Sequence, residues 1–211
     1  MEVTKIIKLK LKKNDYQKII ASLMIFALIS LYVISHNGAE IPFDSQVFKI
    51  LNDIRDNNFI VNVMKVISFL GSLEFLLPFI GILVAYYIYR KNYIIALKLG
   101  LSTGLTGILN QLTKLVFNRM RPFKYMLIEQ TGFSFPSGHT MTNFCFYLIV
   151  ASILSEKYPN YKWVFYTIAV ILGFIMGLSR IILGVHWATD VLAALILGYV
   201  CYAMIKKIEF A

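Results

Sequence analysis

Three short polar segments interrupt an otherwise apolar sequence, and each carries side chains that can do chemistry. They are KLVFNRMRP (114–122), PSGHT (136–140) and SRIILGVHWATD (179–190). Together they supply cations, imidazoles, a carboxylate and a glycine-bearing turn: Lys114, Arg121, Arg180, His139, His186, Asp190, Ser137 and Gly138. That inventory fits phosphoryl transfer, because a transferring phosphoryl group needs its equatorial oxygens neutralised and one group on each side for attack and departure.

The segment 136–140 combines features of a helix start with features of an anion site. Pro136 fixes the entry to a helix and Ser137 can cap it, while Gly138 lets the backbone come close to a ligand. His139 stands in the expected first turn. A helix N-terminus with free N–H groups and a positive dipole end favours an anion, so this segment is predicted to hold one.

The segment 179–190 places an imidazole and a carboxylate four residues apart. His186 and Asp190 share one face if this stretch is helical. A carboxylate that accepts from one imidazole nitrogen fixes the tautomer and leaves the other nitrogen as a nucleophile. The spacing therefore predicts a nucleophilic histidine that Asp190 positions.

Helices in a membrane must position these motifs, because the rest of the chain is too apolar for a soluble domain. Of 211 residues, 58% are hydrophobic and 15% are charged, whereas a soluble domain carries about a quarter charged residues. Roughly 20 apolar residues cross the hydrocarbon core as a helix. Six segments qualify: 18–35, 72–90, 93–114, 138–155, 162–179 and 188–205. The sequence thus predicts an all-α integral membrane protein with six transmembrane helices in a single domain, 1–211.

The apolar segments also contain two cysteines and a group of glycines. Cys145 and Cys201 are interpreted as buried thiols, and no disulfide framework is expected. The glycines are interpreted as small surfaces for close helix packing. They are Gly100, Gly104, Gly107, Gly173 and Gly177.

The region 36–71 differs from the predicted spans, because its apolar residues recur at helical spacing with charges between them. This pattern indicates amphipathic helices along the membrane surface, between spans one and two. The first span follows a basic stretch but is longer than the apolar region of a signal peptide. No A-x-A cleavage site follows it, so it is expected to be an uncleaved anchor.

The distribution of lysine and arginine predicts the orientation in the membrane. Six lysines lie within the first 18 residues, so the N-terminus, 1–17, is expected in the cytoplasm beside anionic lipid heads rather than on nucleic acid. With six spans, both termini are cytoplasmic and the three polar segments meet at the outer face. Cations also occur in the third-to-fourth connection, where the parity of the spans places them outside, and a bound anion would explain them. They are Lys114, Arg119, Arg121 and Lys124.

The three polar segments resemble the signature motifs of the type 2 phosphatidic acid phosphatase family, K-x6-R-P, P-S-G-H and S-R-x5-H-x3-D. Each motif is complete here, from Lys114 to Pro122, from Pro136 to His139 and from Ser179 to Asp190. The motifs cover residues 114–190, and the six-span layout extends the resemblance over most of the chain.

The resemblance implies a role for each motif residue. His186 would attack phosphorus to form a phosphohistidine, and Asp190 would hold it. His139 would protonate the leaving oxygen and then assist the water that releases phosphate. The phosphate would be cradled by Lys114, Arg121, Arg180, Ser137 and the Gly138 backbone. No metal or other cofactor is implied, and the motifs carry cations where a magnesium site needs clustered carboxylates.

The same motifs occur in soluble acid phosphatases and vanadium haloperoxidases, and the predicted spans favour the lipid-acting branch. The preferred hypothesis is metal-independent hydrolysis of a lipid phosphate at the outer face of a bacterial cytoplasmic membrane. Phosphatidylglycerophosphate, undecaprenyl diphosphate and phosphatidate are the candidate substrates, and no nucleic acid or obligate protein partner is expected. Two alternatives remain: a phosphotransferase acting on a lipid or sugar hydroxyl, and a non-catalytic phospholipid carrier.

Overall fold

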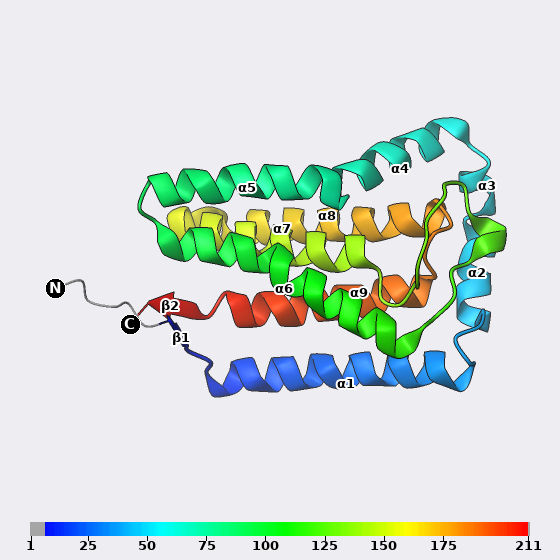
Figure 1. The fold of residues 1–211 in the computed structure, drawn as a ribbon, viewed down its shortest axis with the longest axis horizontal. Coiled ribbons are helices and arrows are strands. Elements are labelled where there is room, and N and C mark those ends of the chain that lie inside the picture. The colour runs from blue at the N-terminus through cyan, green and yellow to red at the C-terminus, as the bar shows by residue number, and fades with distance from the viewer. Residues whose placement is uncertain (1–6, 211) are drawn as a thin grey trace.

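The computed structural model describes residues 7–210, so part of the predicted basic N-terminus, residues 1–6, lies outside the described residues. Helices make up most of the chain, as predicted, and two short strands lie next to its ends (Figure 1). The elements are β1 (Ile7–Leu9), α1 (Lys13–Ser35), α2 (Pro42–Ile50), α3 (Asn52–Arg55), α4 (Asn58–Leu70), α5 (Leu73–Tyr89), α6 (Tyr93–Phe117), α7 (Gly138–Lys157), α8 (Lys162–Ile182), α9 (Ala188–Ile205) and β2 (Ile208–Phe210), with 3-10 turns at Phe123–Tyr125 and Pro159–Tyr161.

Within the described residues, four helices are long and apolar enough to cross a membrane by themselves: α1, α6, α8 with the turn before it, and α9. The pair α4 and α5 meets the same criterion together, although it is bent by 45°. α7 is 20 residues long, but its first turns carry the polar sequence GHTMTN. These helices make the chain a multi-pass membrane protein.

α7 lies at the centre of the bundle, where it packs against α6, α8 and α9. Met141, Cys145 and Ile149 on this helix are completely buried. Cys145 and Cys201 are buried free thiols, as predicted. By contrast, the outward faces of the surrounding helices expose large apolar side chains such as Val116 (76%) and Trp163 (85%), as expected for a surface that faces lipid.

The region 36–71 forms three helices that build one end of the bundle. α2 and α3 cross this end, and α4 leads back along α8 into α5 (Figure 1). The bend between α4 and α5 lies at Gly71, whose carbonyl accepts from Asn143 Nδ2 of α7 at 2.8 Å. A Cβ at Gly71 would lie 2.3 Å from Met176 Cε, so glycine allows this close approach to α8.

Helix packing explains only some of the glycines in the apolar segments. At Gly173 a Cβ would lie 2.2 Å from the Phe144 ring, and at Gly177 it would lie 2.5 Å from Val191. These two positions confirm the packing interpretation. It is wrong for Gly100, Gly104 and Gly107, where a Cβ would meet nothing within 4 Å, so no neighbouring side chain packs closely on these glycines.

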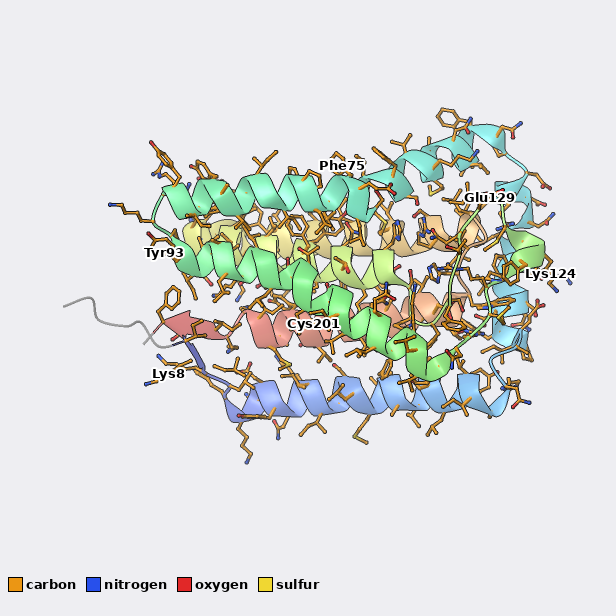
Figure 2. All side chains as sticks on the ribbon, viewed as in Figure 1. Lys8, Phe75, Tyr93, Lys124, Glu129 and Cys201 are labelled. Atoms are coloured by element: carbon orange, nitrogen blue, oxygen red, sulfur yellow. The ribbon has the colours of Figure 1, made fainter. Side chains whose placement is uncertain are left out.

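The strands require a correction to the all-α prediction. β1 and β2 pair in antiparallel register, with Ile7 opposite Phe210, so both ends of the described chain lie together. They lie at the end of the bundle away from α2 and α3. Figure 2 marks the two ends of the bundle by labelled side chains, with Lys8 at the end near β1 and β2 and Lys124 at the end near α2 and α3.

Candidate active site

The three sequence motifs converge at the end of the bundle that α2 and α3 cross. A cavity of about 550 Å³ is lined by the start of α5, the last turns of α6, the start of α7, the loop 130–133 and His186. Five predicted site residues line it, namely Lys114, Arg121, Gly138, His139 and His186. Three others, Ser137, Arg180 and Asp190, are buried behind the wall. The cavity lining contains no carboxylate.

The start of α7 forms one wall of the cavity. Ser137 occupies the N-cap position, but its side chain makes no capping hydrogen bond. Its Oγ instead accepts from Thr140 Oγ1 at 3.0 Å, so the predicted side-chain cap is wrong. The first-turn N–H groups of an α-helix have no partner within the helix, and without a side-chain cap they are available to an anion.

Gly138 has a packing role as well as the predicted one. A Cβ there would lie 2.8 Å from Asn110 Oδ1 of α6. The Asn110 amide donates to the Pro136 carbonyl at 3.0 Å. Glycine is therefore required to hold the start of α7 against α6, and the same close approach places His139 on the cavity wall.

His186 lies in the turn before α9 rather than on a helix. Asp190 is the third residue of α9, and its Oδ2 accepts from the Trp187 backbone N–H at 3.0 Å and contacts His186 Nδ1 at 3.3 Å. The helix that a shared face would require is therefore absent at His186, although the predicted pair does meet. The helix start brings the two together, because the carboxylate caps the turn that carries the imidazole.

The hydrogen bonds of His186 define which of its nitrogens carries the proton. Nε2 lies 3.2 Å from Arg121 Nη1, and a guanidinium can only donate. Nε2 is therefore the acceptor, and Nδ1–H donates to Asp190. Burial and then the neighbouring cations Arg121, Arg180 and Lys114 keep the pKa of His186 well below its ordinary value. The imidazole is therefore neutral at pH 7, and its Nε2 lone pair accepts from Arg121 at the cavity wall.

Arg121 holds the loop that covers the cavity. Its Nε donates to the carbonyls of Thr131 (3.1 Å) and Gly132 (2.9 Å). Its Nη1 donates to the carbonyl of Val185 at 2.7 Å. Burial lowers the pKa of Arg121 to about 10, so the group remains charged at pH 7. The positive edge beside His186 Nε2 is thus fixed in place by backbone acceptors.

Arg180 lies directly behind the cavity, with 1% of its surface exposed. Its guanidinium donates to Ser68 Oγ of α4 and to Gln130 Oε1 at 3.0 Å. Its Nε is buried without a hydrogen-bond partner among the described residues. The third predicted cation, Lys114, is half-buried and lines the cavity itself. Lys114 and Arg121 therefore line the cavity, and Arg180 lies behind its wall.

Two functional residues were not assigned from the sequence, Arg119 and Asp44. Arg119 is 1% exposed and lies between two fully buried carboxylates. Its Nη1 is 2.7 Å from Asp190 Oδ1, and its Nη2 is 2.7 Å from Asp44 Oδ2. Asp44, on α2, also accepts from the Thr189 backbone N–H at 2.9 Å. The unexpected excess of cations at 114–124 was the available signal for Arg119.

This chain of ion pairs determines the charge state of Asp190. A carboxylate that is completely buried is costly to ionise unless it is paired. Arg119 provides that pairing, and Asp44 balances the second side of the guanidinium. Burial raises the pKa of Asp44, and Arg119 opposes this effect. The network links Asp44 on α2, Arg119 in the loop after α6 and Asp190 at the start of α9. It therefore fixes the Asp190 carboxylate, which orients His186.

The fold and the site together define a class: a multi-pass membrane protein with a cationic cavity that holds an oriented, neutral imidazole. Within residues 7–210, no three His, Cys, Asp or Glu side chains are placed to bind a metal ion. A neutral imidazole beside fixed cations is suited to attack on a bound phosphate.

Comparison with known proteins identifies the family. The PAP2 superfamily model matches residues 95–211. Phosphatidylglycerophosphatase B from Bacillus subtilis is 36% identical over 89% of this chain and 93% of its own length. Undecaprenyl-diphosphatase from Sulfolobus acidocaldarius is 27% identical over 83% of this chain and 84% of its own. The chain belongs to the PAP2 superfamily.

A solved structure shares the fold. The transmembrane PAP2-type phosphatidylglycerolphosphate phosphatase from Bacillus subtilis superposes with a TM-score of 0.77 at 30% identity, over 90% of this chain and 94% of the other. The family predicted from the motifs is thereby confirmed, and so is the enzyme class, a lipid phosphatase.

Proposed function

We propose that this protein hydrolyses a lipid phosphate monoester or diphosphate through a phosphohistidine intermediate, without a metal ion. One observation carries the proposal: His186 lines a cavity that Lys114 and Arg121 also line, with its unprotonated Nε2 beside Arg121 and its Nδ1 held by Asp190. The relatives named above act on phosphatidylglycerophosphate or undecaprenyl diphosphate according to their names, and phosphatidate is the third candidate substrate.

The reaction proceeds in two displacements. Nε2 of His186 attacks phosphorus as the bond to the lipid oxygen breaks, and His139 gives that oxygen its proton. The neutral His139 then takes a proton from water, whose oxygen attacks the phosphohistidine and releases inorganic phosphate. Lys114, Arg121 and Arg180 neutralise the phosphoryl oxygens in both steps, together with the N–H groups at the start of α7.

The position of the cavity supports a lipid substrate that enters sideways from the membrane. α5 and α6 lie close together at the end near Tyr93 and diverge toward α4 (Figure 1). The cavity lies in this opening, where its lining includes the exposed side chains of Leu73 on α5 and Leu115 on α6. A headgroup can thus reach His186 while its tail stays among lipids.

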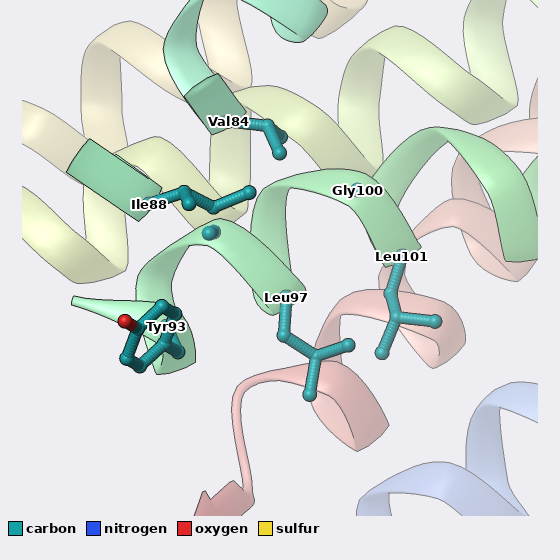
Figure 3. Close-up of a pocket in the computed structure, with 7 residues that line it drawn as sticks. Val84, Ile88, Tyr93, Leu97, Gly100 and Leu101 are labelled. Atoms are coloured by element: carbon teal, nitrogen blue, oxygen red, sulfur yellow. The ribbon is translucent and has the colours of Figure 1, made fainter. Parts of the chain in front are cut away.

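The unpartnered glycines of α6 extend this path for the tail. Gly107 lines the catalytic cavity, and Gly100 lines a second, largely apolar cavity of about 360 Å³ farther along α5 and α6. Figure 3 shows residues that line it, Val84 and Ile88 on α5 and Leu97, Gly100 and Leu101 on α6. Two separate cavities along α5 and α6 offer room for a long acyl or polyprenyl tail, and their apolar lining predicts little selectivity among tails.

We also propose six membrane crossings, with the catalytic cavity outside the cytoplasm of a bacterial cell. The pairing of β1 with β2 supports an even number of crossings, because it joins both ends of the described chain. The crossings would be α1, the bent pair α4 and α5, α6, α7, α8 and α9, so α7 brings the number to six. It packs against α8 and α9 at the bundle centre, and the polar residues GHTMTN at its start lower its hydropathy.

The proposal is tested by phosphate release from purified protein in detergent. Phosphatidylglycerophosphate, undecaprenyl diphosphate and phosphatidate should each be assayed with and without a chelator. We expect turnover of at least one of them that the chelator leaves unchanged, and an acid-labile phosphohistidine at residue 186 after rapid quenching. His186→Ala should abolish turnover and keep lipid binding. Binding without turnover in the wild type would favour the carrier, and phosphate appearing on an added alcohol would favour the transferase.

A further inference from the structure

A separate polar cavity lies toward the other end of the bundle, near β1 and β2. It has a volume of about 340 Å³ and lies between α1, α7, α8 and α9. Its lining shares no residue with the catalytic cavity. The polar part of its wall is mostly basic and aromatic, with one carboxylate, and the residues involved are Asp15, Lys18, Tyr166, Tyr199, Tyr202, Lys206 and Lys207.

Lys206 is held inside this cavity by two tyrosines. Its Nζ donates to Tyr166 Oη at 2.9 Å and to Tyr202 Oη at 3.1 Å, and the two hydroxyls are 2.7 Å apart. An ammonium has three N–H donors, so these contacts leave one N–H for another acceptor. Lysines at a membrane boundary usually extend their amines toward water, whereas this amine is retained between two hydroxyl groups.

The cavity carries an excess of positive charge. Lys207 pairs with Asp15 at 2.8 Å, which neutralises one of its cations. Lys18 and Lys206 have no ion-pair partner among residues 7–210, and both line the cavity. The cluster therefore offers two uncompensated charges and several N–H and O–H donors, which together complement the acceptor oxygens of an anion.

Another part of the same wall is apolar. It consists of Phe144 and Leu148 of α7 and Val170 of α8. Free inorganic phosphate makes no use of such a surface. A molecule with a phosphate at one end and a hydrocarbon chain at the other satisfies both parts of the wall.

We infer that this cavity binds the headgroup phosphate of an anionic phospholipid from the leaflet on the side of β1 and β2. The phosphate contacts Lys206 and Lys18 beside the tyrosine hydroxyls, and an acyl chain lies against Phe144 and Val170. The site is distinct from the catalytic cavity and does not depend on the reaction proposed there. Bound lipid would tie α1 to α8 and α9, because the lining side chains come from all three.

The inference is tested by lipid binding to the full chain in nanodiscs of dioleoyl phosphatidylcholine. Dioleoyl phosphatidylglycerol is titrated in, and the lipid retained on the protein is counted by native mass spectrometry. We expect preferential retention of phosphatidylglycerol in the wild type. Each of Lys206→Met and Lys18→Ala should weaken it roughly fivefold, since a basic residue near an anionic headgroup contributes about 1 kcal/mol.

Lys162→Ala is the matched control, because Lys162 is exposed at the start of α8 near the same end of the bundle and does not line the cavity. Any phosphatidylglycerol in the catalytic cavity contributes equally to all these variants. Retention in Lys206→Met and Lys18→Ala equal to that in Lys162→Ala would overturn the inference. So would competition by millimolar inorganic phosphate, which would indicate a simple anion site. Lys18 is exposed, so its variant keeps the test valid if Lys206→Met does not fold.

Discussion

At the scale of single residues, the carboxylate of Asp190, which we propose positions His186, depends on partners that were not assigned from the motifs. Asp190 and Asp44 each lie 2.7 Å from the same buried guanidinium, that of Arg119, and both are completely buried. Only Asp190 contacts His186. The two aspartates therefore provide a matched pair of variants, in which loss of an ion pair can be separated from loss of imidazole orientation.

Asp190→Asn and Asp44→Asn should lower stability to a similar extent, by about 3 kcal/mol, because each leaves a buried partner incompletely paired. Turnover should differ. Asp190→Asn favours the wrong tautomer of His186, which should cost about 10⁴-fold in kcat. Asp44→Asn acts only through Arg119 and should cost roughly 10- to 100-fold, as for partners one contact removed from a reacting group. Thermal unfolding in detergent and phosphate release measure the two effects; equal losses of kcat would contradict the assignment of Asp190.

Arg119→Met should be more damaging than loss of an exposed cation nearby. It leaves two buried carboxylates without a counter-charge, for which a loss of about 3–5 kcal/mol is expected. Lys124→Ala is the control, since Lys124 forms an exposed pair with Glu40 and such pairs contribute about 1 kcal/mol or less. Melting temperatures of the two variants check the prediction, and similar values would show that the buried network contributes little.

On the acid side, kcat/KM should begin to fall only at a pH below the ordinary pKa of histidine; this part of the pH profile is called the acid limb. Attack requires neutral His186, so kcat/KM falls as pH falls through its pKa. Burial and the cations lower this pKa, so the nucleophile should stay active at pH 6. Arg121 is the first of those cations, and Arg121→Gln should move the limb to higher pH, besides lowering the rate. Comparing both proteins on one substrate cancels the ionisation of the substrate itself. An unmoved limb would show that His186 does not control it.

At the scale of elements, the turn between α8 and α9 positions His186, the proposed nucleophile. Gly184 has a φ of +69°, and a Cβ there would lie 1.8 Å from the Tyr125 carbonyl oxygen. The turn therefore packs directly on the backbone of the loop that follows Arg121. This contact, two residues before His186, determines how the imidazole faces the cavity.

Gly184→Ala should lower stability by about 2 kcal/mol or more, because it combines an unfavourable φ with a backbone clash. The same substitution should displace His186 and therefore reduce kcat. Gly81→Ala is the matched control, since this helical glycine has nothing within 4 Å of a Cβ. That substitution should leave activity unchanged and stabilise α5 by up to about 1 kcal/mol. Unfolding curves and kcat test both, and a harmless Gly184→Ala would mean that the turn can relax.

At the scale of the whole molecule, the two ends of the bundle should face opposite sides of the membrane. Lys8 and Lys124 lie at these ends (Figure 2), and both native cysteines are buried. In intact cells, a membrane-impermeant maleimide should label Lys124→Cys directly and Lys8→Cys only after permeabilisation. Labelling of both from outside, or of neither, would contradict the proposed six-span topology.

The sequence by itself determined the chemistry and most of the helices. Motif residues could be recognised because phosphoryl transfer requires particular side chains at short, fixed spacings, as in His186 and Asp190. Helices could be recognised because the membrane requires long apolar segments. The predicted spans at 138–155 and 188–205 correspond to α7 (Gly138–Lys157) and α9 (Ala188–Ile205).

Only the tertiary structure decided how these residues are held and which others assist them. Arg119 is 75 residues from Asp44 and 71 from Asp190, and no local pattern encodes pairs at such distances. For the same reason, the sequence alone does not distinguish Gly173, which packs against Phe144, from Gly100, which faces open space. A side chain's type limits what it can bind, but its partners depend on which distant segments the folded chain brings within a few ångströms of it.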